Sequence, residues 1–394
     1  MQAVVYRGTD KMVVENKPKP KIIQDTDAVL RITSAAICGS DLHMYEGRTD
    51  VEQGKTFGHE IMGVIEAVGS AVQQIKVGDR VVLPFNVACG YCYNCLRGFT
   101  SACMTMDESP GAAYGYADMG PYEGGQAEYV RVPFADFNAL KLPGKPFDEH
   151  EDDFLMLADI FPTAYHAAML AKVTTGIPTA IFGAGPVGLL SVMSAKILGA
   201  SDIYLVDHYK TRLDKGKEMG ATPIDMNNGD PVQQIRDLRA KSPQTEALRD
   251  GESILTTGVL AGIDAVGYQS HDQDDMSKED HTQVIDHLSE LLLPTGAMGL
   301  IGVYMPADPG EKGPAAEGKY LLPLGTLWNK GITIGMGQCP VKKYNEQLRD
   351  LIIAGRANPG TIVSHHINIK DAPEYYKRFD NREEGVTKVV IQFK

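Results

Sequence analysis

The sequence lacks an excess of basic residues. Among its 394 residues, 38 Lys and Arg stand against 51 Asp and Glu, which gives a formal net charge of −13 at pH 7. Nucleic-acid binding depends on clustered Lys and Arg, so this balance argues against a nucleic-acid partner. The net charge favours solubility but carries no information about the fold.

The sequence also lacks a long uninterrupted hydrophobic run. The longest apolar stretch covers residues 180–198, and it contains Gly183, Gly185, Gly188 and Lys196. Such a stretch is a poor candidate for a membrane span. The chain opens with a strand-like pattern instead of the charged and then apolar leader of an export signal. We therefore expect no membrane partner.

Cysteine is scarce, and the six cysteines are unevenly placed. A secreted disulfide scaffold is smaller and denser in cysteine, so that class is excluded. Four of the six lie within fifteen positions, namely Cys89, Cys92, Cys95 and Cys103. Clustered cysteines in a chain of this type suit a metal better than disulfides. We expect a reducing, cytoplasmic setting.

The cysteine cluster itself has the spacing Cys-x2-Cys-x2-Cys-x7-Cys, with Gly90 and Gly98 allowing the loop to fold back. Four thiolates make a closed tetrahedral zinc site, and a closed site is structural. An iron–sulfur cluster or unrelated free thiols are the alternatives. The loop is predicted to hold a structural zinc ion.

The chain is too long for one simple core, so two domains are expected. The first 160 or so residues are rich in short β-branched runs separated by turn residues, which predicts a compact barrel or sandwich. The predicted strands include residues 4–6, 28–32, 63–68 and 80–83. A return to short strands is expected after residue 333, ending with a strand at 387–393.

A different pattern begins at Thr179. An apolar strand (179–182), a glycine turn (183–188), a helix (187–198) and a second strand (202–207) follow one another, which is a βαβ unit. Residues 262–266 and 299–303 fit further parallel strands. Residues 267–281 and 305–318 are expected to be loops, and loops of this length are often functional lids or disordered.

The glycine turn has the context that a dinucleotide site requires, because it follows a strand and opens a helix. Gly183 permits the tight turn, Gly185 lets a pyrophosphate approach the backbone, and Gly188 lets the helix pack on the strand. Pro186 and Val187 begin the helix, whose N-terminus would face the phosphates. A glycine turn without a ligand is the alternative.

Two residues bear on the choice of dinucleotide. Asp207 ends the second strand, where a carboxylate accepts hydrogen bonds from the adenosine ribose and repels a 2′-phosphate. Asp207 therefore favours NAD over NADP. Arg212 is close enough in sequence to bind a phosphate, and it remains a second candidate contact.

A second metal site is predicted between residues 38 and 60. Cys38 and His59 offer the thiolate and imidazole ligands that zinc prefers. A catalytic zinc has three protein ligands and one open position. The spacing leaves four candidates for the third ligand: Glu60, His150, Asp159 and His166. A helix N-cap is the alternative role for Asp159.

With these motifs, the chain resembles the zinc-dependent medium-chain dehydrogenase/reductase (alcohol dehydrogenase) family over its whole length. The motifs that carry the resemblance are residues 38–43 (CGSDLH), 58–60 (GHE), the four-cysteine loop and the turn at 183–188. A narrower resemblance is to the glutathione-independent formaldehyde dehydrogenase and formaldehyde dismutase branch. It rests on residues 84–90, 112–116, 124–130, 158–166 and 337–341 and on the loop at 267–281.

The resemblance implies an α/β architecture. It comprises a β-rich GroES-like catalytic domain at 1–165 and a Rossmann domain, with a doubly wound parallel sheet for NAD, at 166–334. A C-terminal segment at 335–394 would return to the catalytic domain. The resemblance also implies a homo-oligomer, either a dimer or a tetramer, and residues 332–334 are a candidate edge strand for pairing. In the resembling branch, the loop matching residues 267–281 covers the adenine end of a tightly held NAD.

The resemblance also assigns roles at the active site. Asp159 matches the third ligand of the catalytic zinc, and Glu60 would lie in its surroundings or bind it transiently. Ser40 and His43 match a proton relay, which suits the near-neutral pKa of histidine.

The implied reaction is hydride transfer to NAD from an aldehyde hydrate or a small alcohol, with formaldehyde oxidised to formate. Formaldehyde in water is mostly its gem-diol, so this oxidation is chemically an alcohol oxidation. Dismutation on tightly bound NAD, a general alcohol or polyol dehydrogenase, and a non-catalytic NAD-binding protein are the alternatives.

Overall fold

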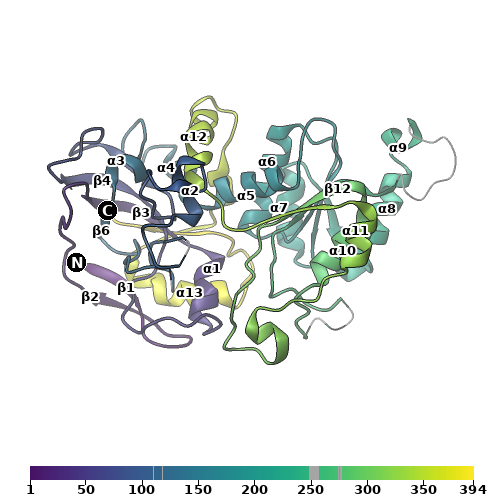
Figure 1. The fold of residues 1–394 in the computed structure, drawn as a ribbon, viewed down its shortest axis with the longest axis horizontal. Helices are drawn as coiled ribbons and strands as arrows, with labels where there is room; N and C mark the ends of the chain where they lie inside the picture. Colours follow the sequence, from purple (N-terminus) through teal and green to yellow (C-terminus); the bar gives the residue numbers. More distant parts are fainter. Residues whose placement is uncertain (110, 118, 248–256, 274, 276) are drawn as a thin grey trace. The chain divides into compact units, whose positions relative to one another are not determined.

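The computed structural model describes residues 1–109, 111–117, 119–247, 257–273, 275 and 277–394. The chain forms two compact units, each described by itself below (Figure 1). The first contains Met1–Pro162, Pro309–Glu311 and Gln338–Lys394, and the second contains Thr163–Asp308 and Lys312–Gly337. Among the described residues, no helix is long and apolar enough to cross a bilayer.

The first unit is built on β-strands, as its composition of short β-branched runs predicts. Its main sheet has the order β14-β15-β3-β4-β5-β7, with β6 pairing β3, and a separate hairpin joins β1 and β2. The strands are β1 (Gln2–Tyr6), β2 (Met12–Asn16), β3 (Ala28–Ile37), β4 (Glu60–Val68), β5 (Arg80–Leu83), β6 (Tyr129–Val132), β7 (Leu140–Lys141), β14 (His365–Ile367) and β15 (Val389–Gln392).

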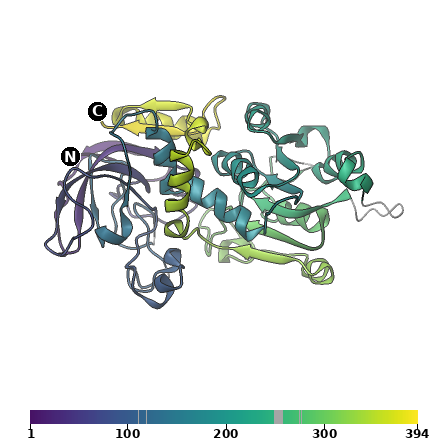
Figure 2. The same cartoon turned by 90° about the horizontal axis from the view of Figure 1, so that it is seen from above.

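Strand β3 is the centre of this unit, because it pairs antiparallel with β4, β6 and β15. The pairing with β15 brings the end of the chain beside its first hundred residues, and Figure 2 shows this yellow segment next to the purple strands. Apolar residues of both segments form one core, including Val4, Ile37, Tyr376 and Val389. The helices of the unit are α1 (Gly39–Tyr45), α2 (Tyr93–Leu96), α3 (Ala135–Asn138), α4 (Glu151–Leu155), α12 (Asn345–Ile353) and α13 (Ala372–Asp380).

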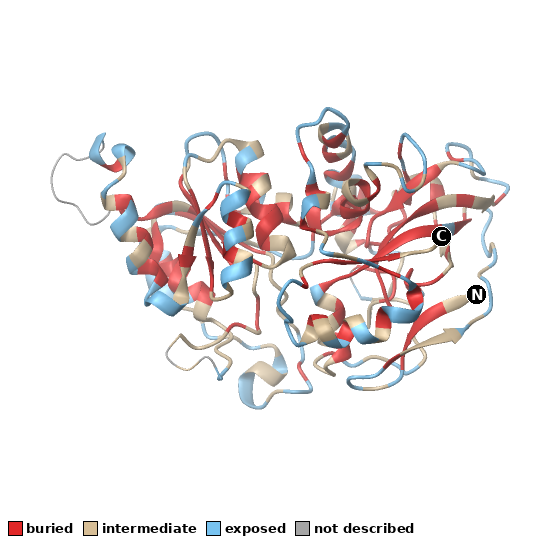
Figure 3. Ribbon diagram, turned by 180° about the vertical axis from the view of Figure 1, so that it is seen from behind, coloured by how far each residue is buried: buried red, intermediate tan, exposed pale blue. Residues whose placement is uncertain are grey.

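The second unit contains a six-stranded parallel sheet in the order β10-β9-β8-β11-β12-β13. This is the strand order of a Rossmann fold, with its topological switch between β8 and β11. The strands are β8 (Thr179–Phe182), β9 (Ile203–Asp207), β10 (Thr222–Asp225), β11 (Val259–Asp264), β12 (Leu292–Leu300) and β13 (Thr333–Met336). Figure 3 shows that buried residues follow these strands, whereas exposed residues lie on outer helix faces. The predicted α/β fold class, with a Rossmann parallel sheet, is confirmed.

Helix α5 (Ile160–Leu170) precedes the first strand of this sheet, and the other helices connect its strands. They are α6 (Pro186–Leu198), α7 (Lys210–Glu218), α8 (Pro231–Ala240), α9 (Pro243–Ala247), α10 (Gln283–Leu291) and α11 (Leu324–Lys330). The predicted strand at 179–182 and helix at 187–198 are confirmed, and Gly199 ends α6 with φ +88°. A left-handed residue at this position is the usual helix C-terminus, and glycine adopts it without strain.

Two predicted strands of this unit end earlier than the sequence indicates. Strand β11 stops at Asp264, whose carboxylate accepts hydrogen bonds from the N–H groups of Val266 and Gly267. Strand β12 stops at Leu300, because Gly302 passes so close to Gly267 that a Cβ would lie 2.2 Å from its nitrogen. The segments that follow β11 and β12 therefore cross each other in close backbone contact where they leave the sheet.

Candidate active site

Cys38 and His59 are brought together by neighbouring strands. Cys38 directly follows β3 and caps helix α1, where Asp41 accepts a hydrogen bond from its N–H at 3.0 Å. His59 directly precedes β4, and the register pairs Ala36 with Glu60. The antiparallel pairing of β3 and β4 therefore places both predicted ligands at one end of the sheet.

Asp159 joins them from a point about a hundred residues further along the chain. It lies between a short 3-10 turn (Met156–Ala158) and α5, and the carbonyl of Ala158 accepts a hydrogen bond from Phe85 N at 2.9 Å. Its Oδ2 lies 3.2 Å from His59 Nε2 and 3.8 Å from Cys38 Sγ. Of the spacing candidates for the third ligand, Asp159 and Glu60 lie in this cluster.

These separations fit a tetrahedral zinc ion. With bonds of about 2.0 Å to nitrogen or oxygen and about 2.3 Å to sulfur, tetrahedral ligands lie about 3.3 Å (N to O) and about 3.5 Å (S to O) apart. The observed 3.2 Å and 3.8 Å are close to both values. In the described part of the chain, Cys38, His59, Glu60 and Asp159 are all buried, with ligand atoms within 4.8 Å of one another.

The other two spacing candidates are placed differently. His150 is partly exposed, and its Nδ1 lies 3.3 Å from Asp153 Oδ2. His166 lies within α5, and it is absent from the groups of potential ligands found among the described residues. The geometry thus leaves Asp159 and Glu60 as the candidates for the third zinc ligand.

Asp41 contacts both the start of α1 and the ring of His59. Its Oδ1 lies 3.2 Å from His59 Nδ1, so the opposite ring nitrogen faces Cys38 and Asp159. Gln126 donates to Asp41 Oδ2 at 3.2 Å, and Tyr376 donates to Gln126 at 2.8 Å. A carboxylate behind a ligating histidine fixes the ring orientation, and its loss commonly impairs metal binding. The only sequence signal for it is its position three residues after Cys38.

The pKa of His59 reflects this arrangement. Burial lowers the pKa of the ring, but Asp41 and Asp159 outweigh burial and raise the pKa well above its usual value. Burial raises the pKa of the Cys38 thiol. Metal binding requires a neutral imidazole and a thiolate, so a divalent cation would replace these protons.

Glu60 is adjacent to His59 but faces a cation of its own. Its carboxylate is fully buried, and it forms an ion pair with the equally buried Lys388, at 2.6 Å from Oε2. Burial raises the pKa of Glu60, and Lys388 opposes this effect. Lys388 stands immediately before β15 and has no sequence motif, so sequence reasoning missed it.

The predicted relay residues lie on α1. Ser40 Oγ is 3.4 Å from Cys38 Sγ and 3.4 Å from His59 Nε2. His43 follows three residues later, which places it on the same face of the helix. Aromatic rings border His59, since Phe85 and Tyr116 each have ring centroids 6.1 Å from it.

The four-cysteine loop forms a separate buried cluster. The Sγ atoms of Cys89 and Cys95 are 3.9 Å apart, those of Cys92 and Cys103 are 3.9 Å apart, and those of Cys89 and Cys103 are 3.6 Å apart. A tetrahedron of sulfurs about 2.3 Å from zinc has edges of about 3.8 Å, so the loop has the dimensions of a zinc site. All six cysteines are free of disulfides.

The glycine turn of the second unit is tightly packed at one glycine and open at another. A Cβ on Gly188 would lie 1.7 Å from the carbonyl oxygen of Gly183, whereas a Cβ on Gly185 would meet nothing within 4 Å. Gly183 has φ +94°, and Gly185 caps α6 with Pro186 and then Val187 beginning the helix. This is a cradle that a side chain at Gly185 would obstruct, and it fits a pyrophosphate.

Asp207 lies at the carboxyl end of β9, as predicted, but its carboxylate also serves the backbone. Its Oδ2 accepts a hydrogen bond from Ala184 N at 2.6 Å, and its Oδ1 accepts from His208 N and Tyr209 N at 2.7 and 2.8 Å. Asp207 thus ties the glycine turn to the next loop. Arg212 lies in α7, with its guanidinium 4.8 Å from the ring centroid of Tyr209.

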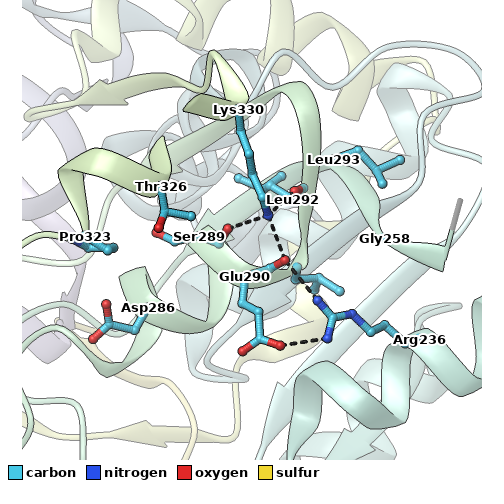
Figure 4. Close-up of a pocket in the computed structure, with 11 residues that line it drawn as sticks. Arg236, Gly258, Asp286, Ser289, Glu290, Leu292, Leu293, Pro323, Thr326 and Lys330 are labelled. Carbon is cyan, nitrogen blue, oxygen red and sulfur yellow. Dashed lines mark hydrogen bonds and ion pairs between the residues drawn. The ribbon is translucent and has the colours of Figure 1, made fainter. Parts of the chain in front are cut away.

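A cavity of about 420 Å³ lies elsewhere in the second unit, at the amino ends of β11 and β12 (Figure 4). Lys330 donates to the carbonyls of Ser289, Glu290 and Leu292, and Arg236 forms an ion pair with Glu290. These cations therefore satisfy the carboxyl end of α10. Ligands of open parallel sheets bind at the carboxyl ends of the strands, so this cavity is unrelated to the glycine turn.

Comparison with known proteins agrees with this geometry. The alcohol dehydrogenase GroES-like domain family matches residues 24–144. A glutathione-independent formaldehyde dehydrogenase of Pseudomonas aeruginosa is 38% identical over 391 residues, covering 96% of this chain and 94% of that protein. A formaldehyde dismutase of Pseudomonas putida is 34% identical over 392 residues, with the same two coverages of 96% and 94%.

A solved structure extends the likeness to the whole chain. Alcohol dehydrogenase TADH from Thermus sp. ATN1 superposes with a TM-score of 0.83 at 31% identity, covering 100% of both chains. The GroES-like domain, the Rossmann sheet and the sequence relatives all indicate the same family. This chain is therefore an oxidoreductase that belongs to the zinc-dependent medium-chain dehydrogenase/reductase (alcohol dehydrogenase) family.

Proposed function

We propose that this protein oxidises formaldehyde, as its hydrate, to formate by hydride transfer to NAD. The observation that carries the proposal is the buried cluster of Cys38, His59 and Asp159, in which a fourth candidate, Glu60, is paired with Lys388. Three ligands and an open position are the pattern of a catalytic zinc, in contrast to the four-cysteine loop. The likeness to proteins named formaldehyde dehydrogenase supports the substrate.

In this proposal, the first unit holds both zinc ions and the substrate. Zinc, when bound, supplies a Lewis acid that makes a substrate hydroxyl more acidic. Ser40, which lies 3.4 Å from two of the ligands, accepts the hydroxyl proton, and His43 passes it towards water. Asp41 holds the His59 ring in register throughout. Phe85 and Tyr116 line the site and exclude bulky substrates.

The second unit holds the cofactor. NAD, when bound, accepts the hydride. Gly185 leaves room for the pyrophosphate at the start of α6, and Val187 and Gly188 offer N–H groups there. Asp207 favours the ribose hydroxyls of NAD, and Arg212 is a further phosphate contact. We propose that the loop at 267–281, of which residues 274 and 276 lie outside the described residues, covers the adenine end, as the resemblance implies.

The first test measures metal and turnover together. We expect two zinc ions per chain by mass spectrometry, and one after either Cys38→Ala or Cys103→Ala. NADH formation should be fastest with formaldehyde in a panel with methanol, ethanol and longer alcohols, and Cys38→Ala and Asp159→Ala should abolish it. Cys339→Ala is the matched control, since this buried cysteine lies outside both clusters, and it should keep both zinc ions. Unchanged turnover in Cys38→Ala would contradict the zinc mechanism, whereas wild-type protein that forms no NADH with any substrate of the panel would favour a non-catalytic NAD-binding protein.

Dismutation is the second candidate, favoured by the 34% identity to a protein of that name. Dialysis followed by release of bound cofactor separates the two. NAD that remains bound, together with equal yields of methanol and formate, would support dismutation, whereas NAD that washes out would exclude it. A faster rate with longer alcohols or polyols would favour a general alcohol dehydrogenase.

We also propose a cytoplasmic homo-oligomer, a dimer or a tetramer. Strand β13 is the edge of the parallel sheet, and it has neither proline nor charge to prevent pairing with a second copy. Light scattering during size exclusion should give a multiple of the 42.8 kDa chain mass. A monomer at assay concentration would contradict this proposal.

A further inference from the structure

Lys388 is the most deeply buried cation next to the candidate active site. Its side chain and that of Glu60 have no exposed surface. The ammonium group has three partners: it donates to Glu60 Oε1 at 2.7 Å and to the carbonyl of Ile37 at 3.1 Å, and it lies 2.6 Å from Glu60 Oε2. Among the described residues Glu60 Oε2 accepts no hydrogen bond, so its contact with the ammonium group is electrostatic.

The backbone around Lys388 is held as firmly as its side chain. The carbonyl of Lys388 accepts hydrogen bonds from Ser364 N and Ser364 Oγ at 2.9 and 3.0 Å. The next residue, Val389, begins β15 and pairs with Ile37 of β3. Because Cys38 directly follows Ile37, the same strand pairing fixes both the ligand and the cation.

A buried ion pair needs a reason, because desolvation often cancels the attraction between its members. The charges around the predicted zinc site give a reason for this ion pair. A thiolate at Cys38 and a carboxylate at Asp159 balance a divalent zinc ion, with His59 neutral. Behind His59, the buried Asp41 carboxylate accepts a hydrogen bond from Gln126, and Glu60 would add one more negative charge, which Lys388 balances.

The Glu60 carboxylate is also close enough to the predicted zinc site to compete for a coordination position. One of its carboxylate oxygens lies within 4.8 Å of the ligand atoms of Cys38, His59 and Asp159. A carboxylate is a good zinc ligand, and a fourth protein ligand turns an open catalytic site into a closed structural one. Without Lys388, zinc would be the nearest cation to Glu60.

We propose that Lys388 is a positioning residue that holds Glu60 away from the metal and so keeps the fourth coordination position open to substrate. This inference rests on the proposed function, because it needs zinc at Cys38, His59 and Asp159. It predicts that removal of the ammonium group closes the site, and that removal of the carboxylate as well reopens it.

The test uses the full-length protein with cobalt(II) in place of zinc and imidazole as the external ligand. Imidazole changes the visible absorption of cobalt where a position is open, whereas the closed four-cysteine site stays silent. Wild-type protein should respond and Cys38→Ala should not. If wild type gives no response, or if Cys38→Ala responds like wild type, the proposed zinc site itself fails.

Given a wild-type response, three variants decide the role of Lys388. Lys388→Met should bind cobalt but raise the dissociation constant for imidazole about tenfold or more. Glu60→Gln should keep the wild-type response, since its carboxylate is not a ligand at rest. The double variant should regain the response that Lys388→Met loses, because an amide is a weaker ligand than a carboxylate.

Equal imidazole binding in wild type and Lys388→Met would overturn the proposal. So would a double variant that takes up cobalt and remains unresponsive. If Lys388→Met does not fold, recovery of both the fold and the imidazole response in the double variant supports the proposal. Such recovery would show that the unpaired Glu60 carboxylate prevented folding. Failure of both variants to fold would overturn it, since Lys388 would then serve the fold independently of Glu60.

Discussion

The two glycines of the dinucleotide turn should respond in opposite ways to the same substitution. A methyl group on Gly188 would lie 1.7 Å from the carbonyl oxygen of Gly183 and 2.8 Å from its carbonyl carbon. Ordinary carbon-to-oxygen contacts are about 3.3 Å or more, so the turn would have to move by more than about 1.5 Å. Gly188→Ala should therefore lower the free energy of unfolding by about 3 kcal/mol.

Gly185→Ala should leave the fold intact and remove the cofactor. Gly185 has φ −68° and ψ −177°, which any residue adopts, and its Cβ position is empty. Alanine should change stability by less than about 1 kcal/mol, in the stabilising direction, because it restricts the unfolded chain. A pyrophosphate at this position would meet the methyl group, and we expect NAD affinity to fall at least about 100-fold, or about 2.8 kcal/mol.

The assay pairs urea unfolding of cofactor-free protein, followed by circular dichroism, with calorimetric titration of NAD. Bound cofactor must be removed first, because a ligand of the folded state raises apparent stability. Each variant is the control for the other, since both add one methyl group to the same turn. Gly185→Ala with wild-type NAD affinity, or Gly188→Ala with wild-type stability, would refute the reasoning.

Three further predictions address stability and cofactor choice. Arg80→Met should lower the free energy of unfolding by about 3–5 kcal/mol in urea titrations, because it leaves the buried carboxylate of Glu151 without its cation; a loss under about 1 kcal/mol would speak against it. Burial lowers the pKa of His287 in the fold, so the unfolded chain takes up a proton first as the pH falls below 6.5. The neutral ring thus contributes stability that is present above pH 6.5 and lost in more acidic solution, and His287→Gln should flatten this part of the pH profile; an unchanged profile would contradict the assignment. Asp207→Asn should weaken NAD binding relative to NADP about tenfold in calorimetry, and Arg212→Met in that background should remove the gain for NADP; an unchanged ratio would exclude the role of Asp207.

Local motifs allowed much of the fold to be predicted from the sequence. The strand, glycine turn, helix and strand from Thr179 to Asp207 are each defined by neighbouring residues, and the structure has all four. The same holds for the cysteine loop, whose members lie within fifteen positions. Strand ends were harder to predict, because Gly302 and Gly267 stop their strands by approaching each other.

The surroundings of the candidate active site could not be predicted, because they are assembled from distant parts of the chain. Glu60 and Lys388 are separated by 328 positions, and Tyr376 and Gln126 by 250. Neither pair has a spacing or composition that marks it. The first pair is decided by the pairing of β15 with β3, and Tyr376 is placed by the packing of α13 into the core with Val4 and Phe57, which only the folded chain reveals. Asp41 was visible in the sequence, but its contact with His59 depends on the pairing of β3 with β4.

Asp207 shows how a correct motif can conceal a second role. The motif assigns its carboxylate to the ribose, yet in the fold three backbone N–H groups already donate to it, including that of Ala184 in the glycine turn. A residue that selects the ribose and also ties down the turn couples cofactor choice to turn geometry. Alanine would remove both functions at once and leave them inseparable. Asparagine removes the charge that repels a 2′-phosphate and keeps one acceptor oxygen, but its NH2 group cannot accept the bonds that the other carboxylate oxygen takes. Asp207→Asn therefore disturbs the turn less than alanine does, and its urea unfolding must be measured beside its NAD-to-NADP ratio to separate the two roles.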